Sequence, residues 1–290
     1  MQSKGLGCHV EKMYNERQGG GDDVARVITK ITRQKRNEER YNIYLDEKYA
    51  FSVDEAIIIQ YGLTKGKSLD EMAVGEIAFD DEVSRAYNRA LSFLAYQMRS
   101  EHEVHQKLLK AEFGEAVIQE AIQKLTRLGF LNDETYATAL AETKKRTSKK
   151  GPKAILQDLK QKGIDPKLQQ EVVEAFSEEE QLSMAMELAE KKVRQEQRKT
   201  PSQIKQKVQE FLVRKGYSFS IVQQVLETIV IQPEEDEWTS LIDLQGEKVW
   251  RKYSQKYEGY ELRMRVKQAL YQKGFPAEVI EQYIEKREQE

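Results

Sequence analysis

The chain has 290 residues, of which 47 are lysine or arginine and 49 are aspartate or glutamate, so its formal net charge is −2. That balance excludes a uniformly basic nucleic-acid-binding protein, and the single cysteine, Cys8, excludes an internal disulfide framework. Charged residues make up 33% of the chain and apolar residues 39%, a composition typical of slender, solvent-exposed helices rather than of one thick core.

Residues 1–22 are polar and rich in glycine, without hydrophobic periodicity, and we predict a disordered extension. They lack the apolar core of a secretory signal, and no apolar run in the chain is long enough to cross a bilayer. We therefore expect a reduced, cytoplasmic setting without membrane contact. Cys8 lies beside His9 in this segment, where nothing would fix a general base, so we expect no catalytic nucleophile there.

Residues 23–79 differ in composition, because β-branched and aromatic residues are frequent in the stretches VARVITKITRQ, RYNIYL and KYAFSV. The last two alternate apolar with polar residues and are separated by a short turn, Asp46-Glu47-Lys48. The pattern predicts a small β-hairpin or a three-stranded unit. Asp54 then caps the stretch EAIIIQYGL, which predicts one helix that ends at Gly62.

The rest of the chain repeats one motif, in which a leucine is followed by a lysine-glycine pair and then by an apolar residue. That last residue is Phe113, Ile164, Tyr217 and Phe275 in the four copies, and the glycines are Gly163, Gly216 and Gly274. Apolar residues recur around it at helical spacing, and glycine suits the left-handed end of a helix. Each copy therefore predicts a helix, a glycine turn and a second helix. Ala111-Glu112 replaces lysine-glycine in the first copy, which predicts a less regular turn.

A longer helix is predicted before each pair, at about 80–98, 133–149, 178–198 and 236–255. Each begins with acidic residues, such as Asp80-Asp81-Glu82 in the first, and three end in basic clusters, as the helix dipole favours. Several helix starts also carry capping pairs or an early proline: Ser100 with Glu103, Ser177 with Glu180, Thr200 with Gln203, Pro152 and Pro201.

These elements predict a mainly α protein, in which tandem three-helix repeats follow a small N-terminal β-hairpin/α segment. Three short helices cannot bury their apolar faces alone, so we expect neighbours to stack into an elongated, curved, right-handed array. The expected boundaries are 1–22 for the extension, 23–79 for the β-rich segment, and 80–132, 133–177, 178–232 and 233–290 for the four repeats.

His102 and His105 raise the hypothesis of a metal-dependent enzyme, because their spacing could bring both rings to one ion. Their order does not match the HExxH motif, and no third convincing ligand lies nearby in the sequence. Two polar residues on an exposed helix face are the simpler interpretation. We therefore predict no catalytic residue, no metal site and no cofactor.

The basic clusters at the ends of the longer helices are the candidate residues for binding a protein partner or DNA. The helix dipole alone explains cations at these ends, and this alternative stays open. If successive long helices lie side by side in one direction, their basic ends line one edge of the array and their acidic starts line the other. The candidates are Lys144, Lys145, Arg146, Lys149, Lys150, Lys153, Lys191, Lys192, Arg194, Arg198, Lys199, Arg251 and Lys252.

The stretches RYNIYLDEKYAFSVDEAIIIQYGLTKGKSLDE, ALSFLAYQMRSEHEV and LTRLGFLNDETYA, together with the repeated lysine-glycine motif, resemble the RecX family of recombination regulators in its longer, Gram-positive form. The resemblance covers about residues 24–290. It implies a non-enzymatic regulator that lies along the groove of the RecA filament on single-stranded DNA and restrains ATP hydrolysis, strand exchange and co-protease activity. The family core has three such helical repeats, so the fourth departs from its pattern.

The partners expected from this resemblance are the RecA filament and the single-stranded DNA within or beside it, bound by a monomer. A competing hypothesis is a helical-repeat protein that acts directly on DNA through its helix–turn–helix pairs. The predicted second helices FSIVQQVLETI and PAEVIEQYIE count against it, because they carry no lysine or arginine to hold phosphates.

Overall fold

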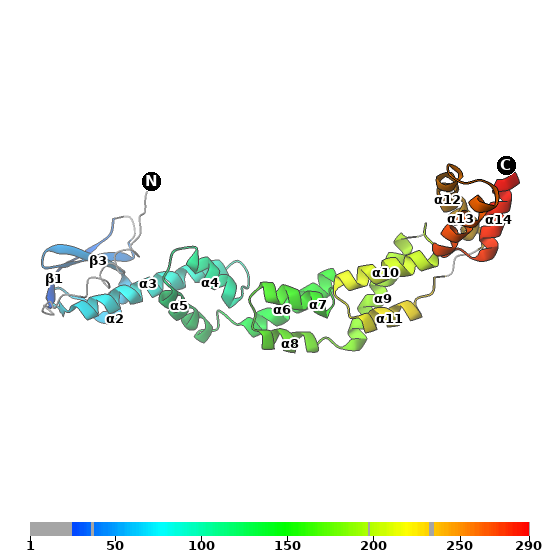
Figure 1. The fold of residues 1–290 in the computed structure, drawn as a ribbon. Helices are drawn as coiled ribbons and strands as arrows, with labels where there is room; N and C mark the ends of the chain where they lie inside the picture. The colour runs from blue at the N-terminus through cyan, green and yellow to red at the C-terminus, as the bar shows by residue number, and fades with distance from the viewer. Residues whose placement is uncertain (1–24, 36–37, 197, 232–234, 290) are drawn as a thin grey trace. The chain divides into compact units, whose positions relative to one another are not determined.

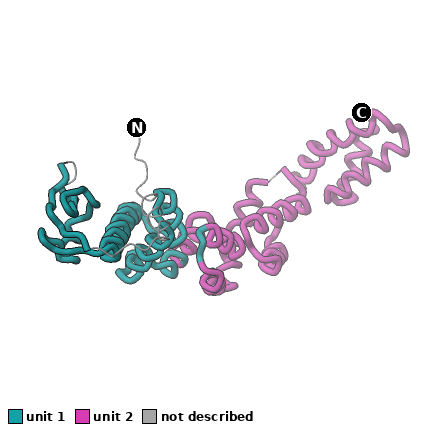
Figure 2. Tube along the Cα trace, turned by 60° about the vertical axis from the view of Figure 1, so that its left-hand side comes forward, with its two compact units in different colours: residues 1–137, 162–164 teal, residues 138–161, 165–290 magenta. Residues whose placement is uncertain are grey.

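The computed structural model describes residues 25–35, 38–196, 198–231 and 235–289. The predicted disordered extension, with Cys8 and His9, lies outside these residues. The chain divides into two compact units, which comprise residues 1–137 with 162–164 and residues 138–161 with 165–290 (Figure 2).

The N-terminal part of the first unit is a four-stranded antiparallel sheet with strand order β3-β2-β1-β4 (Figure 1). Its strands are β1 (Arg26–Arg33), β2 (Arg40–Leu45), β3 (Lys48–Asp54) and β4 (Ser68–Leu69). Asp46 and Glu47 form the turn between β2 and β3 with φ values of 47° and 65°. The helix α2 (Glu55–Tyr61) follows, capped by Asp54 and ended by Gly62 as predicted.

The helix α3 runs without interruption from Glu71 to Leu94, and Asp70 caps its N-terminus. The prediction that Asp80-Asp81-Glu82 starts a helix is therefore wrong, and the expected boundary at residue 80 lies inside α3. Asp80 and Asp81 make tertiary contacts instead, and Asp80 accepts hydrogen bonds from Gln60 and Tyr61. Asp81 accepts hydrogen bonds from both terminal nitrogens of Arg40, at 3.2 and 2.8 Å, and from the backbone N–H of Asp54 at 2.9 Å.

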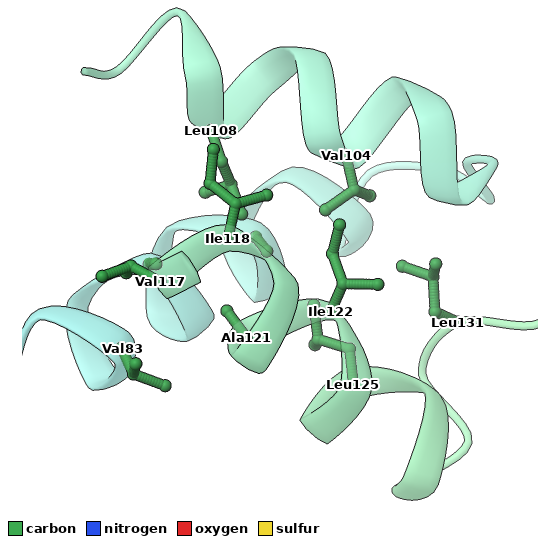
Figure 3. Packing of buried hydrophobic residues seen from close by; sticks show 11 residues of the cluster. Val83, Val104, Leu108, Val117, Ile118, Ala121, Ile122, Leu125 and Leu131 are labelled. Carbon is green, nitrogen blue, oxygen red and sulfur yellow. The ribbon is translucent and has the colours of Figure 1, made fainter. Parts of the chain in front are cut away.

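The second half of α3 packs with α4 (Glu101–Leu109) and α5 (Glu115–Arg127) into the first three-helix repeat. Figure 3 shows side chains of this core, among them Val83 of α3, Val104 and Leu108 of α4, and Ile118 and Leu125 of α5. The apolar residues three or four apart on each helix point into this core, as their spacing requires.

Three further repeats follow along the chain. The second consists of α6 (Asp133–Ser148), α7 (Pro152–Gln161) and α8 (Pro166–Glu174), and the third of α9 (Glu178–Gln195), α10 (Pro201–Lys215) and α11 (Phe219–Thr228). The fourth consists of α12 (Glu235–Ser254), α13 (Gly259–Gln272) and α14 (Ala277–Gln289). The predicted mainly α class, with three-helix repeats after a small strand segment, is confirmed, and the curvature and handedness of the array stay predictions.

A recurring contact, which we call the Lys-Gly junction, joins one repeat to the next. In each case, the N-terminus of one helix meets the lysine-glycine pair of the following repeat. The hydroxyl of Ser100 donates to the carbonyl of Lys162, the N–H of Gly151 donates to the carbonyl of Lys215, and the hydroxyl of Thr200 donates to the carbonyl of Lys273. Each bond joins a hydroxyl or N–H donor at a helix N-terminus to a backbone carbonyl at the C-terminus of another helix, which that helix leaves unpaired.

The glycines of these junctions are needed for close approach as well as for backbone conformation. A Cβ atom on Gly216 would lie 2.6 Å from that of Ala154, one on Gly274 would lie 2.7 Å from that of Ser202, and one on Gly163 would overlap His102. In the first repeat the exposed Glu112 takes the corresponding left-handed conformation, with φ 64°, so positive φ alone does not demand glycine. The repeated glycine thus reflects the packing of one repeat on the next.

Candidate functional site

The basic end of α6 contacts the acidic start of α9. Lys145, only 9% exposed, forms ion pairs of 2.6 Å with Glu142 and 3.0 Å with Glu180, and Lys149 pairs with Glu187 at 2.6 Å. Burial lowers the pKa of Lys145, but hydrogen bonds from its ammonium to the two glutamates outweigh burial and raise it. The expectation that basic ends and acidic starts lie on opposite edges is therefore wrong for the end of α6 and the start of α9.

The other cations of the α6 cluster do not share one face. Lys144 and Arg146 flank the buried Lys145 on roughly opposite sides of the helix, because successive residues turn by about 100°. Lys150 pairs with Asp158 at 2.7 Å, and Lys153 is exposed. Only part of this predicted cluster is therefore available to a partner.

Three exposed cations lie at the end of α9 and just beyond it, and we call Lys191, Arg194 and Arg198 the α9 stripe. Lys191 and Arg194 are three residues apart and share a face of α9, whereas Arg198 follows the C-cap residue, Glu196. No ion pair involves them within the part of the chain that the structure describes. Exposed lysine and arginine side chains of this kind can form charge-assisted hydrogen bonds with phosphate or carboxylate groups.

Lys192 and Lys199 are held instead by one carboxylate, because both contact Glu196 at 2.5 Å. Hydrogen bonds from Lys192, and then from Lys199, lower the pKa of Glu196 to about 2. This carboxylate neutralises part of the charge that the sequence places at the end of α9.

Two cations that the sequence analysis did not select, Arg214 and Lys215, complete a basic cluster around Phe211. The charged groups of Lys192, Arg214 and Lys215 lie 5.9, 5.9 and 5.7 Å from the centre of that ring. Lys215 also donates to the carbonyl of Ser148 at 2.8 Å, so this cluster lies at the Lys-Gly junction of the second and third repeats. We call Lys192, Arg214 and Lys215 the junction cluster.

The remaining candidates lie at the end of α12. Arg251 pairs with Glu247 at 3.4 Å, and the ammonium of Lys252 lies 5.3 Å from the centre of the Tyr253 ring. Both side chains line a surface hollow with Leu244 and Lys248. Among the described residues, no ion pair or hydrogen bond joins these two side chains to α9.

The histidine pair of α4 is used within the fold. The Nε2 atom of His105 lies 2.8 Å from the carboxylate of Glu115, and His102 packs against Gly163. In the described ranges, no cluster of three or more His, Cys, Asp or Glu side chains has the arrangement that a metal ion needs. Over the same ranges, none of the helices combines the length and the apolar character of a membrane span.

Comparison with known domain families accounts for nearly all of the helices and strands. Residues 26–70 match the regulatory protein RecX N-terminal domain, residues 86–125 the first three-helix domain of RecX, and residues 132–173 the second. Residues 178–226 and 235–284 both match the third three-helix domain. The last two repeats are therefore two copies of one domain type.

Curated relatives match over almost their whole length. Regulatory protein RecX of Bacillus subtilis (strain 168) is 42% identical over 262 residues, which cover 90% of this chain and 98% of that protein. Regulatory protein RecX of Bacillus cereus (strain 03BB102) is 39% identical over 268 residues, which cover 91% and 99%.

Two solved structures share the fold. A crystal structure of regulatory protein RecX matches with a TM-score of 0.60 and 38% identity, and covers 70% of this chain and 99% of its own. The crystal structure of RecX from Lactobacillus salivarius matches with a TM-score of 0.50 and 33% identity, and covers 52% and 99%.

Proposed function

Because the chain belongs to the RecX family of regulatory proteins, we propose that it is a non-enzymatic regulator that binds along the filament of the recombinase RecA. Binding lowers the ATP hydrolysis, strand-exchange and co-protease activities of the filament. Single-stranded DNA within or beside the filament is the second partner in this proposal.

The observation that carries the proposal is the repetition of one three-helix unit through the same Lys-Gly junction. A chain of similar units can contact a partner that is itself periodic, one protomer after another. Contacts that are weak singly then combine, because the first contact raises the effective concentration of the next. The α9 stripe and the junction cluster supply the charge for such contacts with carboxylates or phosphates.

The test is the rate of ATP hydrolysis by RecA on single-stranded DNA, measured as the protein is added. We expect the rate to fall, and the amount of protein needed to rise in proportion to the number of filament protomers. An unchanged rate of hydrolysis, together with unchanged strand exchange at saturating protein, would refute the proposal.

Direct action on DNA is the second candidate, and the junction cluster is the observation that favours it. Three cations around one half-buried ring can hold phosphates without reading a base sequence. The helix α11, the second helix of the third helix–turn–helix pair, carries no lysine or arginine. This candidate requires affinity for naked DNA that falls steeply with salt, and a shallow or absent dependence on salt would exclude it.

A further inference from the structure

Among the helices that the structure describes, none covers the outer face of the N-terminal sheet, where Tyr49 is exposed. The inner face carries Ile28, Ile43 and Val53, which are fully buried against Ile57 of α2 and Ile77 of α3. Asn42 and Tyr44 flank Ile43 along β2 and therefore lie on the opposite face. An irregularity in β1 between Ile28 and Lys30 brings Lys30 to that face as well, where it pairs with Tyr44. Tyr49 of β3 pairs with Tyr44 in the sheet register and is 57% exposed. This face therefore combines two aromatic rings, a cation and amides.

The polar groups near the two rings follow one another along β2 on the outer face. The rings of Tyr44 and Tyr49 lie edge to face, with centres 6.0 Å apart, and the ammonium of Lys30 lies 5.6 Å from the centre of the Tyr44 ring. One step along β2, the amide of Gln34 donates to that of Asn42 at 2.8 Å. Beside this amide pair is a hollow of about 430 Å³, lined by Thr32, Arg33, Gln34, Lys35 and Asn42.

We propose that this outer face binds single-stranded nucleic acid. An exposed ring can stack on any base, and Tyr49 offers one in a rigid strand. The step from Tyr44 to Asn42 along β2 is about 7 Å, close to the spacing of nucleotides in an extended strand. A base on Tyr49 would therefore place the following nucleotide near the Gln34–Asn42 amides, with Lys30 and Lys35 positioned for phosphates.

Stacking rather than charge must supply the affinity of this face. Two acids, Asp46 and Glu47, lie in the turn between β2 and β3, between Tyr44 and Tyr49 in the sequence, and reduce the local positive charge. Arg33, at the hollow, is already paired with Glu38 at 3.6 Å. The number of phosphates neutralised is therefore small, and binding at this face falls only weakly with salt. This property separates it from the junction cluster, which would bind phosphates by charge.

The experiment compares two fluorescent strands of equal length, oligo(dT) and a strand with the same backbone but no bases, bound to the full chain without any recombinase. We expect oligo(dT) to bind about tenfold more tightly, because only it can stack. Tyr49→Thr, which keeps a β-branched residue in the strand, abolishes this preference, and Tyr49→Phe keeps it. Lys30→Gln weakens the binding of oligo(dT).

Tyr96→Thr is the matched control, because Tyr96 is 89% exposed at the end of α3, away from the sheet. It leaves the preference for bases unchanged. Thermal unfolding of each variant shows whether a loss reflects an unfolded hairpin, and Lys30→Gln tests the face while keeping both rings. Equal binding of the two strands, or a preference that survives Tyr49→Thr, would overturn the proposal. Since no RecA is present, either result leaves the regulation of RecA untested and intact.

Discussion

The hydroxyl of Ser100 donates a hydrogen bond of 2.6 Å to the carbonyl oxygen of Lys162, although 62 positions separate the two residues. The same oxygen of Ser100 accepts from the N–H of Glu103 at 3.2 Å, so it also caps α4. One fully buried side chain thus caps the N-terminus of α4 and forms the bond of a Lys-Gly junction.

Replacing Ser100 by alanine should cost more than the loss of an ordinary helix cap. The cap itself contributes about 1 kcal/mol to the free energy of unfolding, and leaving the partly buried carbonyl of Lys162 unpaired adds about 1 kcal/mol. Urea denaturation followed by circular dichroism measures the sum. Ser218→Ala is the control, because Ser218 caps α11 without a bond to another repeat. Equal losses in the two variants would show that the junction bond contributes nothing.

Gly216→Ala should destabilise the junction between the second and third repeats. The new Cβ would lie 2.6 Å from that of Ala154, and the backbone would keep a φ of 93° that alanine disfavours. Gly129→Ala isolates the second cost, since Gly129 has a φ of 76° and nothing within 4 Å of the added atom. We expect a loss of about 1 kcal/mol for Gly129→Ala and about 2 kcal/mol more for Gly216→Ala in the same denaturation experiment. Similar midpoints for both would contradict the packing argument.

Two reasons make these glycines necessary, and the sequence alone could predict only the first, the left-handed backbone conformation. The lysine-glycine pairs predict that each helix ends in a left-handed conformation. The structure confirms a positive φ at Gly163, Gly216 and Gly274. The second reason is the approach of a helix from the preceding repeat, which depends on residues more than 50 positions away. A single sequence carries no local signal for such a contact.

Asp81→Ala should loosen the N-terminal sheet while leaving the later repeats folded. Asp81 is 5% exposed and satisfies both Arg40 and the N–H of Asp54, so its removal leaves a partly buried guanidinium without its carboxylate. Breaking such a pair costs roughly 3 kcal/mol. Hydrogen exchange should show faster exchange in β1, β2 and β3. The exposed pair of Arg33 and Glu38 is the control, and Glu38→Ala should change the free energy of unfolding by less than about 0.5 kcal/mol.

The carboxylate of Asp81 also shows why the sequence alone predicts a wrong helix start. Acids just before an apolar periodic stretch are typical of a helix start, and Asp80-Asp81-Glu82 fits that pattern. The partner of Asp81 is Arg40, on a strand far earlier in the chain, so only the tertiary fold distinguishes a buried ion pair from a dipole effect. The candidate site is similar. The sequence predicts most of its cations but misses Arg214 and Lys215. Whether a cation is paired, as Lys145 is, or lies beside Phe211, as Arg214 does, depends on contacts between repeats.

Glu196 should make the stability of the third repeat depend on pH below about 4.5. Its pKa is about 2 in the folded protein, below the ordinary value of 4.5, because Lys192 and Lys199 stabilise the charged form. A lowered folded pKa means that the stabilisation is complete above the unfolded pKa and is lost as the pH falls toward 2. The free energies of unfolding of the wild type and of Glu196→Gln should therefore differ at pH 7 and converge near pH 2. Glu190→Gln, at an exposed position on α9, should show no such convergence.

Charge reversal in the α9 stripe tests whether this surface contacts the filament. Lys191→Glu with Arg194→Glu removes two exposed cations that pair with nothing else among the described residues, so the fold should be retained. If the stripe meets carboxylates or phosphates, about tenfold more of this variant should be needed to halve the rate of ATP hydrolysis by RecA.

Lys160→Glu with Lys167→Glu makes the same change in net charge on exposed positions of α7 and the N-terminal turn of α8. This control should inhibit RecA like the wild type. If it weakens inhibition equally, the effect comes from overall charge and not from the stripe. If neither variant differs from the wild type, the stripe is not the contact surface, and the junction cluster at Arg214 and Lys215 becomes the next set of residues to reverse. Melting curves of both variants must match that of the wild type, because a lost helix end would imitate a lost contact.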